Sequence, residues 1–175
     1  MSEASVSQFP VYSSRPTLRI DGQEFERTSS LLIGMNMQEQ ESGLSSLQLR
    51  FSNVASDSEG SAGFAFEDES EFRLGSTIAV YAGDRDAPQE IFRGIITGLE
   101  AEFPERNPPE LLVLAEDKLQ AARMTRRTQT YESMSVADIA SEIAQRLNLS
   151  PMISGLTDTT STWVQFNESD LAFLR

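Results

Sequence analysis

The 175-residue chain contains no cysteine and no histidine. Disulfide bonds, thiolate nucleophiles, zinc sites with nitrogen or sulfur ligands and the imidazole base of most hydrolytic triads are therefore excluded. No phosphate-binding loop of the Gly-x-x-x-x-Gly-Lys type and no Gly-x-Gly-x-x-Gly fingerprint occurs either. Because the residues of these common chemistries are missing, we expect a protein that is not an enzyme and that carries no cofactor.

Long hydrophobic runs are also missing. The longest two, Ile78–Ala82 and Leu111–Ala115, have five residues each, whereas a helix needs about 20 apolar residues to cross a bilayer. The segment Met1–Tyr12 has neither the basic residues nor the apolar stretch of a secretory signal. We therefore expect a protein that is made in a cytoplasm and does not insert into a membrane.

Charge is strongly one-sided, since 27 acidic residues face 14 basic ones and give a net charge of −13. Such a chain repels nucleic acid and other polyanions. The one basic stretch, from Lys118 to Arg127, contains no aromatic residue on which a base could stack. We expect no sequence-specific nucleic-acid binding, and interpret this stretch as a domain junction or a subunit contact.

An acidic loop is expected between Asn53 and Glu71, which hold six acidic residues and two glycines. The spacing of its carboxylates does not fit a calcium loop, and no second element supplies a partner carboxylate for catalysis. We expect no metal site there and interpret the loop as a solvated surface that can meet basic side chains of a neighbouring subunit. The residues predicted to make subunit contacts are Glu67, Asp68 and Glu69 on the acidic side and Arg123, Arg126 and Arg127 on the basic side.

Short alternating runs separated by turn residues begin at Thr17 and are typical of an antiparallel sheet. Asp21-Gly22 is a preferred two-residue hairpin turn, and Leu31, Ile33, Met35 and Met37 are expected on the buried face of one strand. About six or seven strands fit into residues 17–118, which predicts a small antiparallel β-barrel.

The run Ile91–Phe103 contains two glycines. Ile91, Ile95, Leu99 and Phe103 share one parity, and Gly94 and Gly98 lie on the other. Glycine inside a long strand marks a bend, a bulge or the close approach of another backbone, as a sharply curved barrel requires.

A helical pattern follows the strands. Ser135 and Asp138 form a capping box ahead of an apolar face that runs to Leu147. A second helix start, Asn167-Glu168-Ser169-Asp170, lies less than two turns from the last residue. We therefore expect an α+β protein with a flexible arm at residues 1–16, the β-barrel at 17–118, and the beginning of an incomplete α/β domain at 119–175.

Several stretches resemble one known family, the late-control D type baseplate hub proteins of contractile phage tails and related injection systems. The first barrel of these proteins resembles Phe72–Gly83, Ile91–Ile96 and Leu112–Leu119, and their next domain resembles Tyr131–Ala140 and Gln165–Arg175. The last two stretches are the more specific, because a polar Asn-Glu-Ser-Asp turn opens a helix there. The motif residues are Gly75, Gly94, Gly98, Ser135, Asp138, Asn167, Ser169 and Asp170.

The resemblance implies a structural subunit that forms a homotrimer and joins the central spike to the tail tube, with spike, tube and baseplate proteins as partners. Such a protein is assembled into a tail or injection particle. Hubs of this family carry two barrels, whereas this sequence shows one, which suggests an amino-terminal fragment. The alternative function left open by the residues is a stand-alone β-barrel module that binds a carbohydrate or a peptide through its loops.

Overall fold

The computed structural model describes residues 12–41, 43–56, 62–68, 70–84, 86–158 and 162–175. The chain divides into two compact units, unit 1 with residues 1–38 and 45–117, and unit 2 with residues 39–44 and 118–175. Most of the predicted flexible arm and Glu69 of the acidic loop lie outside the described residues. The first strand begins at Tyr12, inside the range predicted for the arm.

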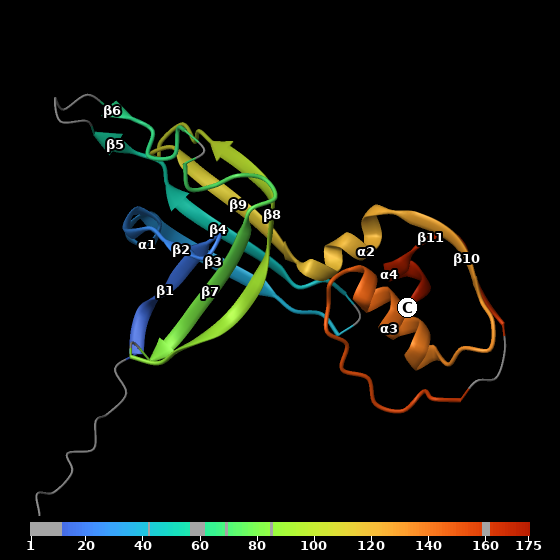
Figure 1. The fold of residues 1–175 in the computed structure, drawn as a ribbon. Helices are drawn as coiled ribbons and strands as arrows, with labels where there is room; N and C mark the ends of the chain where they lie inside the picture. Colours follow the sequence, from blue (N-terminus) through green and yellow to red (C-terminus); the bar gives the residue numbers. More distant parts are fainter. Residues whose placement is uncertain (1–11, 42, 57–61, 69, 85, 159–161) are drawn as a thin grey trace, which may run out of the picture. The chain divides into compact units, whose positions relative to one another are not determined.

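Unit 1 is built on a seven-stranded antiparallel sheet with the order β2-β1-β7-β8-β9-β4-β3 (Figure 1). Its elements are β1 (Tyr12–Ile20), β2 (Gln23–Glu24), α1 (Glu26–Leu31), β3 (Leu32–Gln38), β4 (Ser46–Ser52), β7 (Thr77–Asp84), β8 (Pro88–Glu102) and β9 (Glu110–Asp117). A separate two-residue hairpin, β5 (Ala55–Ser56) with β6 (Ala62–Gly63), lies in the predicted acidic loop. The antiparallel sheet predicted from the alternating pattern is confirmed.

One face of this sheet carries the core of unit 1. Alternating residues point inward, so that Leu49 lies opposite Val113 and Phe51 opposite Leu111 on neighbouring strands. Figure 1 shows β7 and β8 in front of β4 and β9, so the sheet folds back over its own inner face. The buried cluster comprises Leu18, Ile20, Leu32, Leu47, Leu49, Phe51, Phe72, Ile78, Val80, Phe92, Ile96, Leu111, Val113 and Ala115.

The sheet is not closed into a barrel, and the prediction of a barrel is wrong in this respect. Its two end strands, β2 and β3, do not pair with each other in the described residues. The chain between them forms the helix α1, which contacts β1 on one side and β4 on the other. Arg27 of α1 also makes a two-pronged ion pair with Glu71, with N–O distances of 2.6 to 2.9 Å. A helix therefore occupies the place where a closed barrel would have a strand ladder.

Two β-bulges shift which residues face the core, and the prediction that Ile33 lies on the buried face is wrong, whereas Met37 of the same series packs against the core. The pairing of β3 with β4 shifts between Leu32 and Gly34, so Leu32 is buried while Ile33 is 55% exposed. The pairing of β8 with β9 shifts between Ile96 and Gly98. In β8 Phe92 and Ile96 are buried, and Ile91 and Leu99 of the other series pack against the same core while remaining partly exposed. A bulge adds one residue to one strand and exchanges its two faces beyond that point.

Unit 2 packs helices against a two-stranded antiparallel ribbon. Its elements are a short 3₁₀ helix (Lys118–Gln120), α2 (Ala121–Met124), β10 (Arg126–Tyr131), α3 (Val136–Arg146), β11 (Trp163–Ser169) and α4 (Asp170–Phe173). The apolar face of α3 places Ile139 and Ile143 against Tyr131, and Met134, Leu147 and Phe173 pack around them. The predicted helix after Ser135 and the predicted helix start at Asp170 are both present.

Candidate functional site

The open edge of β3 is the first feature with functional potential. β3 is the last strand of the seven-stranded sheet, so one side of its backbone has no strand partner in the described residues. Its sequence, Leu-Ile-Gly-Met-Asn-Met-Gln, contains neither a charge nor a proline. Ile33 and Met35 on it are 55% and 40% exposed. Natural edge strands are normally protected by charges, prolines or cover, because an open edge pairs with other chains.

Gly94 lies where β8 and β9 approach each other most closely. A Cβ added at this position would lie 2.2 Å from the carbonyl oxygen of Glu116 and 2.8 Å from the ring of Phe92. Gly98 has more room, since its added Cβ would meet the flexible side chain of Leu114 at 3.1 Å. Gly75 is required for a different reason: its φ of +87° is a left-handed conformation that favours glycine. These glycines therefore shape the backbone of unit 1.

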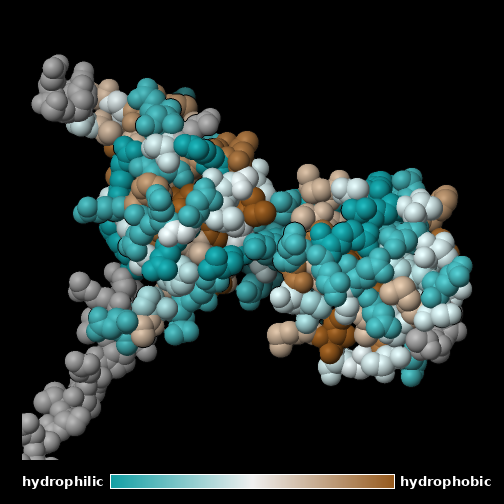
Figure 2. All heavy atoms as spheres, viewed as in Figure 1, coloured by the Kyte–Doolittle hydropathy of each residue, from teal (hydrophilic) through white to brown (hydrophobic). Residues whose placement is uncertain are grey.

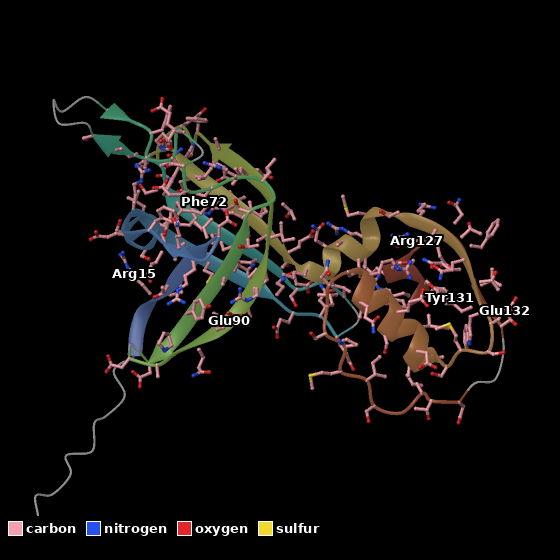
Figure 3. All side chains as sticks on the ribbon, in the orientation of Figure 1. Arg15, Phe72, Glu90, Arg127, Tyr131 and Glu132 are labelled. Carbon is pink, nitrogen blue, oxygen red and sulfur yellow. The ribbon has the colours of Figure 1, made fainter. Side chains whose placement is uncertain are left out.

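A buried polar network forms the centre of unit 2. The side chains of Gln165 and Asp170 are 0% and 2% exposed. Gln165 donates through Nε2 to Asp170 Oδ1 at 2.9 Å and accepts from the hydroxyl of Tyr131 at 3.4 Å. The charge of Asp170 faces two guanidinium groups, with Nε of Arg127 at 3.4 Å and Nη1 of Arg146 at 3.8 Å. Figure 3 shows Arg127 and Tyr131, from β10, on the side of this strand where α3 and α4 lie.

The pKa of Arg146 is raised by this network. The largest cause is its hydrogen bond to the hydroxyl of Tyr131 at 3.3 Å, followed, after a smaller opposing effect of burial, by the charge of Asp170. Arg146 also donates to Gln129, which in turn donates to Glu142 of α3. The network joins β10, β11, α3 and α4, so we interpret it as the set of contacts that stabilises the packing of unit 2.

Ser135 and Asp138 cap α3 reciprocally. The Ser135 hydroxyl accepts from the Asp138 backbone N–H at 3.1 Å and donates to the Asp138 carboxylate at 2.6 Å. Ser169 plays the corresponding part at α4, accepting from the N–H of Ala172. Asn167, two residues earlier, has a φ of +47° and marks the turn into this helix. The motif residues predicted from the sequence therefore begin and shape helices.

Replacing Ser135 by alanine is expected to lower the free energy of unfolding by about 1 kcal/mol, the usual value of a helix cap. The Ser135 hydroxyl and backbone N–H hold the pKa of Asp138 below its usual value. This contribution is present above the carboxyl pKa of the unfolded chain, about 3.9, and is lost as the pH falls through the lower folded value. We expect the parent to be more stable than Asp138→Asn at neutral pH. The difference in their free energies of unfolding, measured by urea unfolding with Trp163 fluorescence, should become smaller as the pH falls below about 3.9. A difference in unfolding free energy that does not change with pH would contradict the capping role of the Asp138 carboxylate.

The predicted subunit-contact residues that the structure describes lie wholly or partly at the surface. Glu67, Asp68, Arg123 and Arg126 are exposed, whereas Arg127 is half-buried by its contact with Asp170. Glu69 is outside the described residues. Their role in assembly stays a prediction.

Charge is unevenly divided between the two units. Unit 1 has nineteen acidic and eight basic residues, and unit 2 has eight and six, so unit 1 carries −11 of the total of −13. Within unit 1, Glu90 pairs with Arg93 and accepts from the hydroxyl of Tyr81, and the bond from Arg93 is the largest cause of its lowered pKa. No cluster of three acidic side chains suited to a metal ion occurs among the described residues.

A shallow polar groove lies on the outer face of the sheet in unit 1. It has a volume of about 310 Å³ and is lined by side chains of β3, β4, β8 and β9. Asn36, Gln38 and Gln48 contribute amide groups, Thr97 a hydroxyl, and Leu114 an apolar side chain. Hydrogen-bonding groups of this kind can bind a polar ligand, but the groove holds no pair of acid and base for catalysis.

Two further features were missed from the sequence. Gln165 is the most deeply buried polar residue of the network, yet nothing in its local pattern distinguishes it from a surface glutamine. Phe64 and Phe103 form an edge-to-face pair, with ring centroids 5.7 Å apart, although they are 42% and 64% exposed. Phe64 lies in a loop that is otherwise mostly polar, which was a signal for this feature, whereas Phe103 directly follows β8.

Comparison with known proteins identifies relatives of the fold. The sequence profile of the family described as "Alg8 N-terminal domain" matches residues 14–175. A search of curated proteins finds no match. In the part of the chain that the structure describes, none of the helices has the length and apolar character needed to traverse a bilayer.

Several solved structures share the fold at low sequence identity. The 43 kDa tail protein of prophage MuSo2 from Shewanella oneidensis matches with a TM-score of 0.68 and 12% identity, over 91% of this chain and 47% of its own. The E. coli c3393 protein is a component of the type VI secretion system and is similar in structure to the T4 tail proteins gp27 and gp5. It matches with a TM-score of 0.65 and 18% identity, over 90% of this chain and 41% of its own. A tail protein from Neisseria meningitidis matches with a TM-score of 0.54 and 14% identity, over 91% of this chain and 43% of its own. The chain spans less than half the length of each of these proteins.

Proposed function

The chain belongs to the Alg8 N-terminal domain family, and from this and its shared fold we propose that it is a structural part of a contractile injection machine. Within that machine it serves as part of the hub that joins the central spike to the tail tube. Its natural protein is made in the cytoplasm, assembles as a homotrimer and contacts spike, tube and baseplate proteins. It catalyses no reaction.

The observation that carries this proposal is the open, uncharged edge of β3. The seven-stranded sheet ends in this edge, and at its other end β2 pairs with β1 at only Arg19 and Ile20. A sheet with two free ends can pair head-to-tail with further copies, and contacts of this kind close into rings. The structures with the same fold come from a prophage tail protein, a secretion-system component and a further tail protein, which supports a role in such an assembly.

Charge on the β3 edge tests the proposal. We expect the natural protein with Ile33→Lys and Met35→Lys to remain folded, because the two side chains are 55% and 40% exposed, so that a lysine at either position can reach solvent. Its incorporation into purified tail or injection particles should fall at least about tenfold, because lysine is a common means of blocking edge pairing. The measurement is quantitative mass spectrometry of particles from cells that express the variant.

Leu74→Lys is the matched control, since Leu74 is 66% exposed and lies outside the strands of unit 1. This variant should be incorporated normally. Equal incorporation of the β3 variant and the control would contradict a role of this edge in assembly.

The polar groove on the outer face favours a second candidate, a module that binds a carbohydrate. Its amide and hydroxyl groups are suited to sugar hydroxyls, and its volume of about 310 Å³ fits one or two sugar rings. For this function the chain should be a monomer whose melting temperature rises with an oligosaccharide, and Gln48→Ala should remove the shift. No shift across an oligosaccharide panel would exclude it.

A further inference from the structure

The core of unit 1 is incompletely covered along β3. Val113 of β9, Leu49 of β4 and Met35 of β3 lie opposite one another on neighbouring strands. Val113 and Leu49 have a strand on either side and are 0% exposed, whereas Met35 on the last strand of the sheet is 40% exposed. Met37, two residues further on, is also only partly buried against the core. Figure 2 shows brown, apolar atoms at the surface of unit 1 among teal, hydrophilic ones. One more strand with apolar inward side chains would complete the burial of this face.

The other face of β3 is polar and uncharged. Asn36 and Gln38 alternate with Met35 and Met37, are exposed, and line the polar groove. The regular ladder with β4 runs over Gly34–Gln38. Every second residue of such an edge strand turns its backbone N–H and C=O groups to the open side. A segment that pairs there sets alternate side chains against the two methionines and the others beside the two amides.

The strands next to β3 carry an excess of negative charge. β4, β8 and β9 together hold six acidic residues and two arginines. Both arginines are ion-paired with glutamates of these same strands. Glu116 lies in the same cross-strand row as Gln38 and lines the groove. A basic segment is therefore attracted to this edge, and an acidic segment is repelled.

We propose that the β3 edge takes up an extended segment of a different protein of the machine, in which apolar side chains alternate with basic ones. The apolar side chains cover Met35 and Met37, and the basic side chains lie beside Asn36 and Gln38. A second copy of the chain fits less well, because its β3 would bring the same acidic strands and its β2 has only two residues, one of them acidic. This inference rests on the proposed function, in which the edge is paired in the particle, and it names the chemistry of the segment that pairs with it.

Cross-linking inside the particle tests which chain lies at this edge. Asn36 of the natural protein is replaced by the photoreactive residue benzoylphenylalanine, and illuminated particles are analysed by mass spectrometry. We expect a cross-link to a segment of a different protein in which apolar and basic residues alternate. The same photoreactive residue at Leu74, which is 66% exposed and lies outside the strands, should not give this product. A cross-link from position 36 to another copy, to a segment without this alternation, or to nothing would overturn the inference.

Synthetic peptides test the chemistry of the segment separately. A peptide of about eight residues in which valine and lysine alternate should bind the parent chain at least about tenfold more tightly than a valine–glutamate peptide of the same length, measured by isothermal titration calorimetry. A peptide with the same valine and lysine content but without alternation should also bind more weakly. Asn36→Lys with Gln38→Lys should reduce the preference for lysine over glutamate at least about threefold, because like charges opposite one another weaken strand pairing. Equal affinities of the three peptides, or no binding of any, would overturn the inference.

The outcomes separate this inference from the hub function. Loss of the variant with Ile33→Lys and Met35→Lys from particles, together with a cross-link from position 36 to another copy, would refute the basic partner segment and leave the hub standing. Normal incorporation of that lysine variant would count against both.

Discussion

Replacing Asp170 by alanine should destabilise unit 2 by about 1–3 kcal/mol, the usual cost of leaving a buried hydrogen-bond donor without its acceptor. The carboxylate is 2% exposed and accepts from Gln165 at 2.9 Å. Its removal leaves the Gln165 amide without this acceptor. It also leaves Arg127 without its nearby negative charge, although the Nε of Arg127 is buried and already has no hydrogen-bond partner in the described residues.

The measurement is urea unfolding followed by the fluorescence of Trp163, the only tryptophan. Trp163 lies in β11, paired in register with Tyr131 of the network, so it reports on unit 2. Glu132→Ala is the matched control, because Glu132 is an exposed acidic residue next to Tyr131 (Figure 3). It should change the unfolding free energy by less than about 0.5 kcal/mol. Equal effects of the two substitutions would show that the network does not hold unit 2 together.

Replacing Gly94 by alanine should destabilise unit 1 by about 3 kcal/mol, the upper end of the usual cost of overpacking. The added methyl group would lie 2.2 Å from a backbone oxygen of Glu116. Backbone cannot rotate away as a side chain can, so β8 and β9 must separate locally. We expect faster hydrogen exchange in peptides covering residues 88–117 and a lower midpoint of thermal unfolding by circular dichroism.

Gly34→Ala is the control for this effect. Gly34 lies in β3 of the same sheet, and its added Cβ would meet only the Cβ of Arg50, at an ordinary distance of 3.8 Å. Gly34→Ala should therefore change the stability of unit 1 very little. If Gly94→Ala is tolerated equally well, the close approach of β8 and β9 is not a constraint on the sequence.

Short-range sequence patterns predicted the structure correctly where the residues that determine it lie close together in the sequence. Ser135 and Asp138 lie three residues apart, so a capping box can be recognised without knowledge of the fold, and the structure has the helix that they begin. The alternating runs that begin at Thr17 likewise predicted an antiparallel sheet, which the structure has. Gly94 was expected at a bend, a bulge or a close backbone approach, and it lies at such an approach.

Short-range patterns failed where contacts between residues distant in the sequence determine the structure. The bulges after Leu32 and Ile96 depend on how β3 and β8 fit their neighbours, and a period of two cannot show where it is interrupted. The closed barrel was wrong because α1 takes the place between β2 and β3. Its stability comes from contacts distant in sequence, such as the ion pair of Arg27 with Glu71. The aromatic pair of Phe64 and Phe103 also depends on such a contact, since the two rings meet only in the fold.

The most direct test of the hub function is the number of copies of the natural protein in a purified injection particle. Native mass spectrometry or quantitative imaging of the isolated spike-and-tube assembly gives this number. The proposal predicts three copies, located where the spike meets the tube. Particles that form with normal composition and contain none would contradict it.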